Sequence, residues 1–417
     1  MVIQRNTYVQ RLIDRQHNGM IKVVTGVRRS GKSFLLFNLF RQYLSGQGID
    51  DRHIISIALD DRMNRELRDP DTLCQYVRSQ ITDTEMYYIL LDEVQFVRDF
   101  EDVLNSFMHI PNADVYVTGS NARFLSKDVI TEFRGRGDEV RIFPLSFREY
   151  LTAFDGTRER ALGEYMLYGG LPQILSYRTP EQKAVYLKNL FTETYITDIK
   201  ERYHIQRDEE LEELINIVSS SIGSLTNPNK IVNTFKSVKN VNIDQTTVKS
   251  YLDYLCDAFL VERAMRYDVK GRHYIGTPSK YYFTDLGLRN ARLNFRQDER
   301  THIMENVIYN DLRIRGFNVD VGIVPVTYTD ENGSRRKTQL EIDFVCNLGS
   351  RRYYVQSAYR IGSDEKRRQE QASLVKVGDS FKKIVIVGDD TPVTRNEQGI
   401  TTIGLMDFLC DEHSLEL

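Results

Sequence analysis

Cysteine is scarce in this chain, with four spread over 417 residues at Cys74, Cys256, Cys346 and Cys410. None belongs to a C-x-x-C pair, and no histidines cluster beside them. A disulfide framework or a structural zinc site would show closely spaced cysteines or cysteine–histidine groups. The distribution therefore argues against both kinds of site.

From the sequence we also expect no membrane-spanning segment and no secretory signal, and the composition has no excess of basic charge. No apolar run approaches the ~20 residues of a spanning helix, and residues 1–16 have no continuous apolar core. Lysine and arginine number 56 against 59 acids, so the formal net charge is -3. Any contact with nucleic acid must therefore be local. We expect a globular cytoplasmic protein without membrane partners, of about two to four domains.

What the chain does contain is a phosphate-binding motif close to its start. Residues 26–33 fit G-x-x-x-x-G-K-[ST] at every fixed position, and they are Gly26, Val27, Arg28, Arg29, Ser30, Gly31, Lys32 and Ser33. The apolar run 21–25 predicts a strand before the loop, and residues 34–43 carry apolar side chains at helical spacing. A simple tight turn would fit the glycines too, but the strand–loop–helix order favours nucleotide binding.

The motif assigns each position a chemical role. Backbone N–H groups surround the phosphates, Lys32 reaches the β and γ oxygens, and the Ser33 hydroxyl ligates magnesium. We expect Phe34, which follows the loop, to lie beside the nucleotide as well. The sequence thus predicts a magnesium-dependent site for a nucleoside triphosphate.

A second nucleotide signature follows, where the apolar run 87–91 ends in Asp92 and Glu93. This is typical of a buried parallel strand whose C-terminal end faces a ligand. Asp92 would hold magnesium, and Glu93 would orient and deprotonate the attacking water. Alone, the two acids would also fit a solvated strand end. After a phosphate loop, they indicate hydrolysis of a nucleoside triphosphate.

The surrounding sequence predicts an α/β fold. Expected strands at residues 53–59 and 113–118 alternate with expected helices at 70–81 and 96–107. Such alternation predicts a parallel sheet with helices on both faces. At the end of the last strand, Thr118, Ser120 or Asn121 would sense the γ-phosphate, although Asn121 would equally suit a helix cap.

Arg136 is a candidate for stabilising charge in the transition state, because it lies between two glycines just after these strands. An arginine finger can act on its own nucleotide or on that of a neighbouring subunit, which would require a homo-oligomer. The alternative is an ordinary solvated loop charge.

Together with P-L-S-F-R-E-Y at residues 144–150 and Y-G-G-L-P at residues 168–172, these motifs resemble a family of bacterial and archaeal AAA-superfamily ATPases with a C-terminal domain of unknown function. In that family a winged-helix region and a nuclease-like fold follow the ATPase core. The resemblance implies that ATP is the nucleotide. It also implies ligand roles for Lys32, Ser33, Asp92 and Glu93, a sensor position for Asn121 and a match of Arg136 to the family's glycine–arginine element. It supplies no substrate.

The expected division is a P-loop ATPase domain at residues 1–152, a helical lid at 153–206, a winged-helix domain at 207–292 and a restriction-endonuclease-like α/β domain at 293–417. Residues 159–167 and 180–202 have helical spacing, which predicts a lid packed on the nucleotide domain. Helices followed by a hairpin between residues 208 and 290 predict the winged helix.

The winged helix suggests a DNA contact. Its third helix, residues 246–257, would enter the major groove and its wing would touch phosphates, through Lys249, Lys270, Arg272 and His273. Asp253 and Asp257 on the same helix weaken this electrostatic footprint. Packing against protein is the open alternative.

The last domain resembles the PD-(D/E)-x-K nucleases, in which acids hold magnesium and a lysine activates water. Glu305 and Asp343 match two of the acids, but Gln356 and Ala358 replace the acid and lysine of the final element. An amide coordinates cations weakly and a methyl group activates nothing. We therefore expect no nuclease activity, with Glu305, Asp343 and Gln356 as relics, weak metal ligands or structural polar groups.

The resulting hypothesis is a magnesium-dependent ATPase whose cycle moves the C-terminal modules and acts on double-stranded DNA or on a protein client. Two rivals remain at this level, an ATP-regulated nuclease and a scaffold that binds ATP without hydrolysing it.

Overall fold

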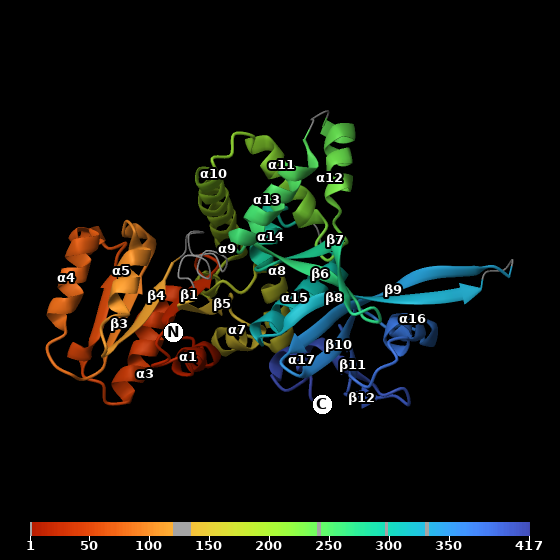
Figure 1. Ribbon diagram of the computed structural model, residues 1–417. Coiled ribbons are helices and arrows are strands. Elements are labelled where there is room, and N and C mark those ends of the chain that lie inside the picture. Colours follow the sequence, from red (N-terminus) through yellow and green to blue (C-terminus); the bar gives the residue numbers. More distant parts are fainter. Residues whose placement is uncertain (1, 120–134, 240–242, 297–298, 330–332) are drawn as a thin grey trace. The chain divides into compact units, whose positions relative to one another are not determined.

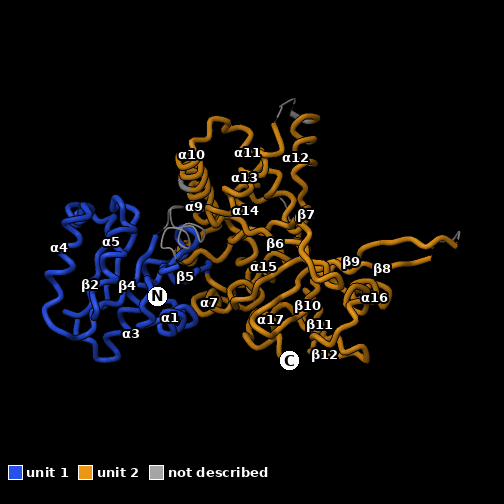
Figure 2. The backbone as a smooth tube through the Cα atoms, viewed as in Figure 1, with its two compact units in different colours: residues 1–144 blue, residues 145–417 orange. Residues whose placement is uncertain are grey.

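The computed structural model describes residues 2–119, 135–239, 243–296, 299–329 and 333–417. They form two compact units, residues 1–144 and residues 145–417 (Figure 2). Each unit contains its own β-sheet.

The first unit is built on a sheet whose five described strands are all parallel to their neighbours (Figure 1). The order is β2-β3-β4-β1-β5, with β1 (Ile21–Gly26), β2 (Ile54–Ala58), β3 (Tyr87–Asp92), β4 (Ala113–Thr118) and β5 (Gly137–Ile142). β3 is buried along its whole length, which explains its unbroken apolar run. Because the strands are parallel, their C-terminal ends share one edge.

Helices cover both faces of this sheet. Ile89 and Leu91 pack with α4 (Pro70–Gln80) and α5 (Phe100–Phe107). Tyr88 and Leu90, which alternate with them, pack instead with residues of α1 (Asn6–Ile13) and of the helix after the phosphate loop. That helix consists of α2 (Lys32–Phe34), a π-helical stretch (Leu35–Phe40) and α3 (Arg41–Gly46). The predicted P-loop NTPase fold is confirmed.

The second unit is built on a mixed sheet of eight described strands, in the order β12-β13-β11-β10-β9-β8-β6-β7. Their bounds are β6 (Val261–Asp268), β7 (His273–Phe283), β8 (Asn318–Thr329), β9 (Arg335–Leu348), β10 (Arg351–Ala358), β11 (Lys382–Val387), β12 (Thr394–Arg395) and β13 (Ile400–Gly404). β8 and β9 form a long antiparallel hairpin, whereas β10, β11 and β13 run parallel.

This sheet joins two segments that the sequence assigned to different domains. β6 and β7, the expected wing, connect to the strands of residues 293–417 through parallel pairing of β6 with β8. The pairing partners include Val321 and Ile323. Both are buried, so the hydrophobic core is continuous between the two segments. Residues 207–292 and 293–417 thus share one sheet rather than having separate ones, and the division into four domains stays a prediction.

The helices of the second unit include one that is buried almost throughout, α15 (Arg300–Ile314), which contacts β7 to β10. The others are α7 (Phe147–Ala153), α8 (Arg158–Tyr168), α9 (Pro180–Asn189), α10 (Thr197–Tyr203), α11 (Asp208–Ser220), α12 (Pro228–Thr234), α13 (Gln245–Asp257), α14 (Leu286–Arg292), α16 (Asp364–Val375) and α17 (Leu405–Cys410). Across the described residues, none of the helices combines the length and the apolar character needed to cross a membrane.

The segment expected as a lid belongs to the second unit, where α8 and α9 contact α14. The Asn290 amide donates to the carbonyls of Met166 and Leu167. The Asp285 carboxylate caps α14 and accepts a hydrogen bond from Gly170 N at 2.8 Å. The Y-G-G-L-P motif is therefore a packing element, because a Cβ at position 169 would lie 2.2 Å from Asp285 Oδ1. A lid role for residues 153–206 stays a prediction.

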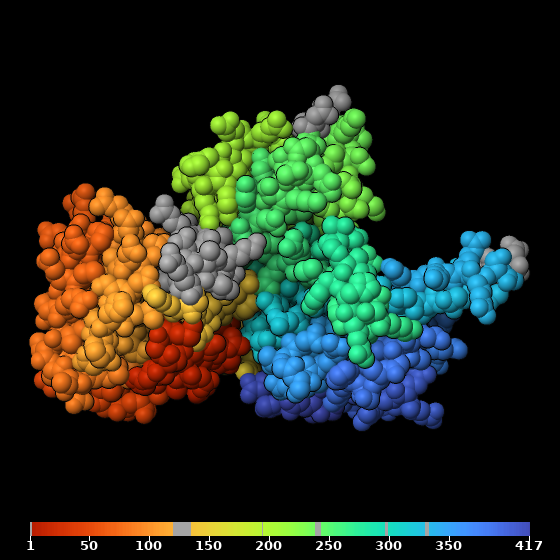
Figure 3. Space-filling model, in the orientation of Figure 1, coloured from red at the N-terminus to blue at the C-terminus, as the bar shows by residue number. Residues whose placement is uncertain are grey.

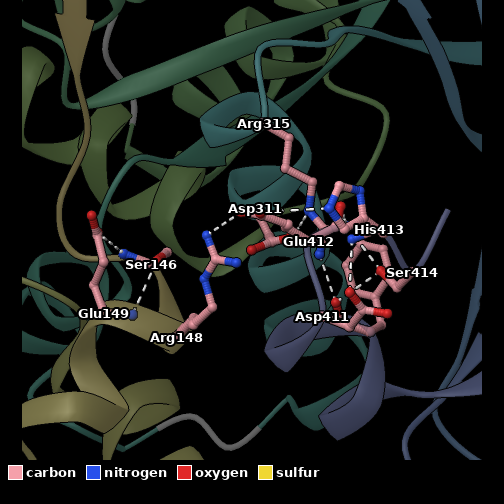
Figure 4. A network of polar contacts seen from close by, with 10 residues as sticks. Ser146, Arg148, Glu149, Asp311, Arg315, Asp411, Glu412, His413 and Ser414 are labelled. Atoms are coloured by element: carbon pink, nitrogen blue, oxygen red, sulfur yellow. Dashed lines mark hydrogen bonds and ion pairs between the residues drawn. The ribbon is translucent and has the colours of Figure 1, made fainter. Parts of the chain in front are cut away.

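The P-L-S-F-R-E-Y motif also has a structural explanation. Ser146 and Glu149 form a reciprocal capping box at the start of α7. Arg148 of the same helix pairs with Glu412 near the C-terminus (Figure 4). Close by, Arg315 bonds Asp311 at 2.6 Å and Ser414 Oγ at 2.9 Å. The network joins α7, α15 and the C-terminal residues.

Candidate functional site

The phosphate loop follows β1 and depends on two glycines. Gly26 has φ 135°, and a Cβ there would lie 2.1 Å from the carbonyl oxygen of Ile142 on β5. Gly31, at the start of the following helix, has φ 95°. Side chains other than hydrogen are strained or excluded at both positions. The two fixed glycines of the motif are thus required by the backbone path of the loop.

Lys32 lies folded over this loop. Its Nζ donates to Gly26 O at 3.0 Å and to Val27 O at 3.2 Å, and its side chain is buried. Burial lowers the pKa of Lys32 to about 8, against the opposing charges of Glu93 and Asp92. An ammonium held by two carbonyls can exchange them for phosphate oxygens, which are stronger acceptors because they are charged.

The two acids lie at the same edge of the sheet as the loop. The Ser33 hydroxyl hydrogen-bonds the carboxyl group of Asp92 at the end of β3. Thr118, at the end of β4, donates its hydroxyl to Asp92 and accepts the Glu93 N–H at 3.1 Å. Burial raises the pKa of Asp92. The structure therefore brings together the loop, both acids and Thr118, as the motif spacing predicted.

These residues fit magnesium. The Ser33 hydroxyl and the Asp92 carboxylate are hard oxygen ligands in direct contact with each other. Magnesium in nucleotide sites takes only one or two protein oxygens and completes its shell with phosphates and waters. Within the described parts of the chain, no group of three His, Cys, Asp or Glu residues is placed to hold a metal.

Two residues missed by the sequence reasoning support this edge. Gln95 donates its side-chain amide to the Glu93 carboxylate, which orients a group whose backbone has φ 53°. Arg5 is 3% exposed and donates to Ser30 O in the loop at 3.0 Å and to Phe143 O at 3.0 Å. Gln95 was within reach of inference as part of D-E-V-Q. A single arginine before the first helix gave no comparable signal.

Apart from Arg136, the remaining predicted residues of the nucleotide site belong to the loop, follow it directly or lie beyond the described part of the chain. Phe34 is 40% exposed at the end of the loop's first helical turn. Ser120 and Asn121 lie outside the described residues. The side chains of Val27 and Ser30 are buried, and Arg29 has φ 64°, so these loop residues contribute their backbone to the site.

Arg136 lies away from the phosphate loop of its own chain. Its carbonyl accepts the Ile21 N–H at the start of β1, and its guanidinium lies 3.4 Å from Asn105 Oδ1. Residue 136 therefore precedes β5 at the N-terminal edge of the sheet, opposite the loop. Five steps of strand separate Ile21 from Gly26, roughly 17 Å at ~3.3 Å per residue. Arg136 cannot reach the loop of its own chain from there, because parallel strands put their two ends at opposite edges.

The candidate DNA contacts of the expected winged helix are exposed. Lys249 lies on α13, while Lys270, Arg272 and His273 lie at the β6–β7 turn. On α13, Asp253 pairs with Arg263 at 3.3 Å. The positive charge is thus concentrated at the turn rather than on the helix.

The acids of the nuclease-like segment surround a lysine that the sequence reasoning missed. Lys280 Nζ, on β7, lies 2.9 Å from Glu305 Oε1 on α15 and 2.8 Å from Glu341 Oε1 on β9. It is also 3.7 Å from Asp343 Oδ1. Tyr282 donates to Glu305 at 2.6 Å. The Lys280 side chain is 4% exposed, so this is a buried ionic cluster.

The surrounding carboxylates favour the charged form of Lys280. Burial alone would lower the pKa of Lys280, but the surrounding carboxylates raise it. Burial and the charge of Glu305 raise the pKa of Asp343 to about 8. Gln356 Oε1 accepts the Asp343 N–H at 3.3 Å. The residues do not fit a magnesium centre, because the ammonium of Lys280 already engages the carboxylates that would hold the metal.

Comparison with known protein families agrees with the P-loop fold of the first unit. A family model described as "AAA domain" matches residues 18–151, and one described as "Domain of unknown function (DUF8612)" matches residues 159–299. An uncharacterised protein of Haemophilus influenzae is 33% identical over 414 residues, covering 98% of each chain. An uncharacterised protein of Methanocaldococcus jannaschii is 27% identical over 95% of this chain and 86% of its own.

Among solved structures, the Walker-type ATPase of Pyrococcus abyssi is 15% identical, with a TM-score of 0.49 over 70% of this chain and 96% of that one. At this level of similarity no function transfers. The identity to the Haemophilus influenzae protein extends over both units. The chain therefore belongs to the same protein family as that protein, and its first unit contains an AAA domain.

Proposed function

We propose that this protein binds ATP with magnesium in the cytoplasm, hydrolyses the nucleotide at the C-terminal edge of the first sheet, and uses the cycle to move its second unit. The observation that carries the proposal is the hydrogen-bonded path from Ser33 through Asp92 and Thr118 to the backbone of Glu93. It connects the phosphate loop to the acid that faces the attacking water.

Each side chain has a role in this scheme. The loop amides and Lys32 bind the β and γ phosphates. Ser33 and Asp92 hold the magnesium, which when bound neutralises charge on the phosphates. Glu93, oriented by Gln95, positions a water and accepts its proton as the water attacks the γ-phosphate. Thr118 couples the two acids, because its hydroxyl donates to the Asp92 carboxylate and accepts from the Glu93 N–H.

Lys32→Met is expected to weaken Mg–ATP binding by about ten- to a hundredfold, because a charge-assisted hydrogen bond contributes about 1.5–3 kcal/mol. Calorimetric titration measures the affinity, and phosphate release under saturating ATP measures turnover. Arg65→Met, at an exposed position, is the control. If the wild-type protein binds ATP but releases no phosphate, it is a scaffold that binds the nucleotide without hydrolysing it.

We also assign Arg136 to the nucleotide of a neighbouring copy, because it lies at the wrong edge of its own sheet. Arg136→Ala and Glu93→Gln proteins are each expected to be nearly inactive, since a finger contributes roughly 10³-fold or more. Their mixture is expected to release phosphate well above the sum of the two separate rates, because one chain supplies Glu93 and the other Arg136. A mixture no faster than that sum would remove the assignment and its homo-oligomer.

The ATP-regulated nuclease is not favoured, because Lys280 occupies the centre of its acids. For the second unit we retain the proposal that it acts on a partner, either DNA or protein.

A further inference from the structure

The hairpin of β8 and β9 extends beyond the rest of its sheet. β10 pairs with β9 between Phe344 and Leu348, and the contact of β6 with β8 ends at Ile323. β8 and β9 nevertheless continue to pair from Pro325 with Gln339 as far as Thr329 with Arg335. Residues 325–329 and 335–340, named here the ribbon, project from the second unit (Figures 1 and 3).

Burial of apolar side chains does not explain why the ribbon forms. Nearly all its residues are exposed, including Tyr328 at 49%. An isolated two-stranded ribbon is marginally stable in water. Both of its edges also leave backbone groups without a neighbouring strand, which is a liability that proteins otherwise shorten or cover. A projecting ribbon of this length therefore suits a binding element better than a core element.

The charges of the ribbon are all of one sign. Its charged residues are Arg335, Arg336 and Lys337, each exposed. Asp330 and Glu331, which come between the two strands in the sequence, lie outside the described residues. Along β9, the next acid is Glu341, which pairs with Lys280. The described ribbon is therefore a local basic surface on a chain of net charge -3.

Strand register assigns these charges to faces. Directly opposed residues share a face and successive residues alternate. Arg335 and Lys337 thus share one face with Thr327, Thr329 and Gln339, whereas Arg336 and Tyr328 lie on the other.

More basic residues gather at the base of the ribbon. Arg266 Nη2 donates to Gln339 Oε1 at 2.8 Å, and Lys270 Nζ donates to Pro325 O at 3.2 Å. Arg272 lies exposed in the same turn as Lys270. The β6–β7 turn thus contacts the base of the ribbon and brings Lys270 and Arg272 close to it, although the turn also contains Asp268.

We propose that the ribbon is an arm for double-stranded DNA, with the Arg335 and Lys337 face directed at the duplex and Lys270 and Arg272 on flanking phosphates. The major groove of B-DNA is about 12 Å wide and admits a two-stranded β-ribbon. The corresponding groove of RNA duplexes is deep and narrow, so the same arm fits RNA poorly. The inference rests on the proposed function in naming DNA as the partner of the ATP-driven cycle.

The test measures binding of full-length protein to a labelled DNA duplex by fluorescence anisotropy, at low and at physiological salt. It is done without nucleotide and repeated in the Lys32→Met background, so a failure of the ATPase proposal leaves the result readable. The variant is Arg335→Glu with Lys337→Glu. Arg178→Glu with Lys188→Glu, at exposed positions at and just before α9, away from the ribbon, is the control of equal charge change.

The ribbon variant is expected to bind DNA at least about tenfold more weakly and to lose about two from the slope of log affinity against log salt, because two phosphate contacts disappear. The control is expected to keep wild-type affinity to within about twofold, and a duplex RNA is expected to bind more weakly than DNA. Equal losses in ribbon and control variants would overturn the proposal. So would unchanged DNA binding accompanied by loss of self-association, which would assign the ribbon to a second copy of this chain.

Discussion

Glu93→Gln protein is expected to bind Mg–ATP about as tightly as wild type and to hydrolyse it at least about a hundredfold more slowly. A positioned general base contributes roughly 10²- to 10⁴-fold, and an amide cannot take up the proton of the attacking water. Binding should survive because the phosphate contacts come from the loop and Lys32, and the Glu93 N–H bond to Thr118 belongs to the backbone. Single-turnover phosphate release and ATP titration measure the two quantities separately.

The control is Glu85→Gln, an exposed acid that precedes the same strand at its opposite end. It makes the same change of charge without touching the site, so its turnover should equal that of wild type. Normal turnover by Glu93→Gln would remove Glu93 from the mechanism. A loss of ATP affinity equal to the loss of rate would show that the residue supports the loop rather than the water.

Lys280→Met is expected to lower the stability of the second unit by about 3–5 kcal/mol, the cost of removing one member of a buried ionic group. Methionine keeps the volume of the side chain but leaves the carboxylates of Glu305 and Glu341 without their cation. Calorimetric unfolding at neutral pH measures the effect. The difference from wild type should shrink towards acid pH, because protonation removes the uncompensated charges. A variant as stable as wild type at neutral pH would contradict the central role of this lysine.

Asp343→Asn is the matched partner for that experiment. The folded-state pKa of Asp343 is about 8, above the ordinary value of 3.8, so the folded chain holds a proton there that the unfolded chain releases. This group therefore makes stability fall as pH rises from about 4 to about 8, and it adds no further slope above that. Asparagine should abolish that contribution and be tolerated at pH 8. Magnesium should not stabilise the wild-type cluster, since the ammonium holds the carboxylates.

The nucleotide site was largely predictable because its information is local. A loop of fixed glycines and a buried strand ending in two acids each specify their own geometry, and parallel strand order brings them to one edge. For Arg136 the sequence left open whether it acts on its own nucleotide or on that of a neighbouring copy, because strand direction, which decides the edge of the sheet, is not written in the residues around it. Its finger role stays a prediction. Asn121 stays a prediction, as do the chemical roles assigned to Glu93 and Ser33.

The second unit was less predictable because its important contacts cross long stretches of sequence. Lys280 lay in a strand expected to be part of a wing, and nothing near it indicated Glu305 or Asp343 as partners. The strands β8 and β9 continue past the body of their sheet into the ribbon, which the residue pattern does not indicate. Polar residues in an exposed ribbon bury no face, so they give no alternating pattern to detect.

The pairing of β6 with β8 also bears on how such a chain can evolve. A break at the expected boundary near residue 292 would separate Lys280 from its three acids and uncover a long strand. Neither half would then be a self-sufficient building block. We therefore expect the two segments to be inherited as a single piece.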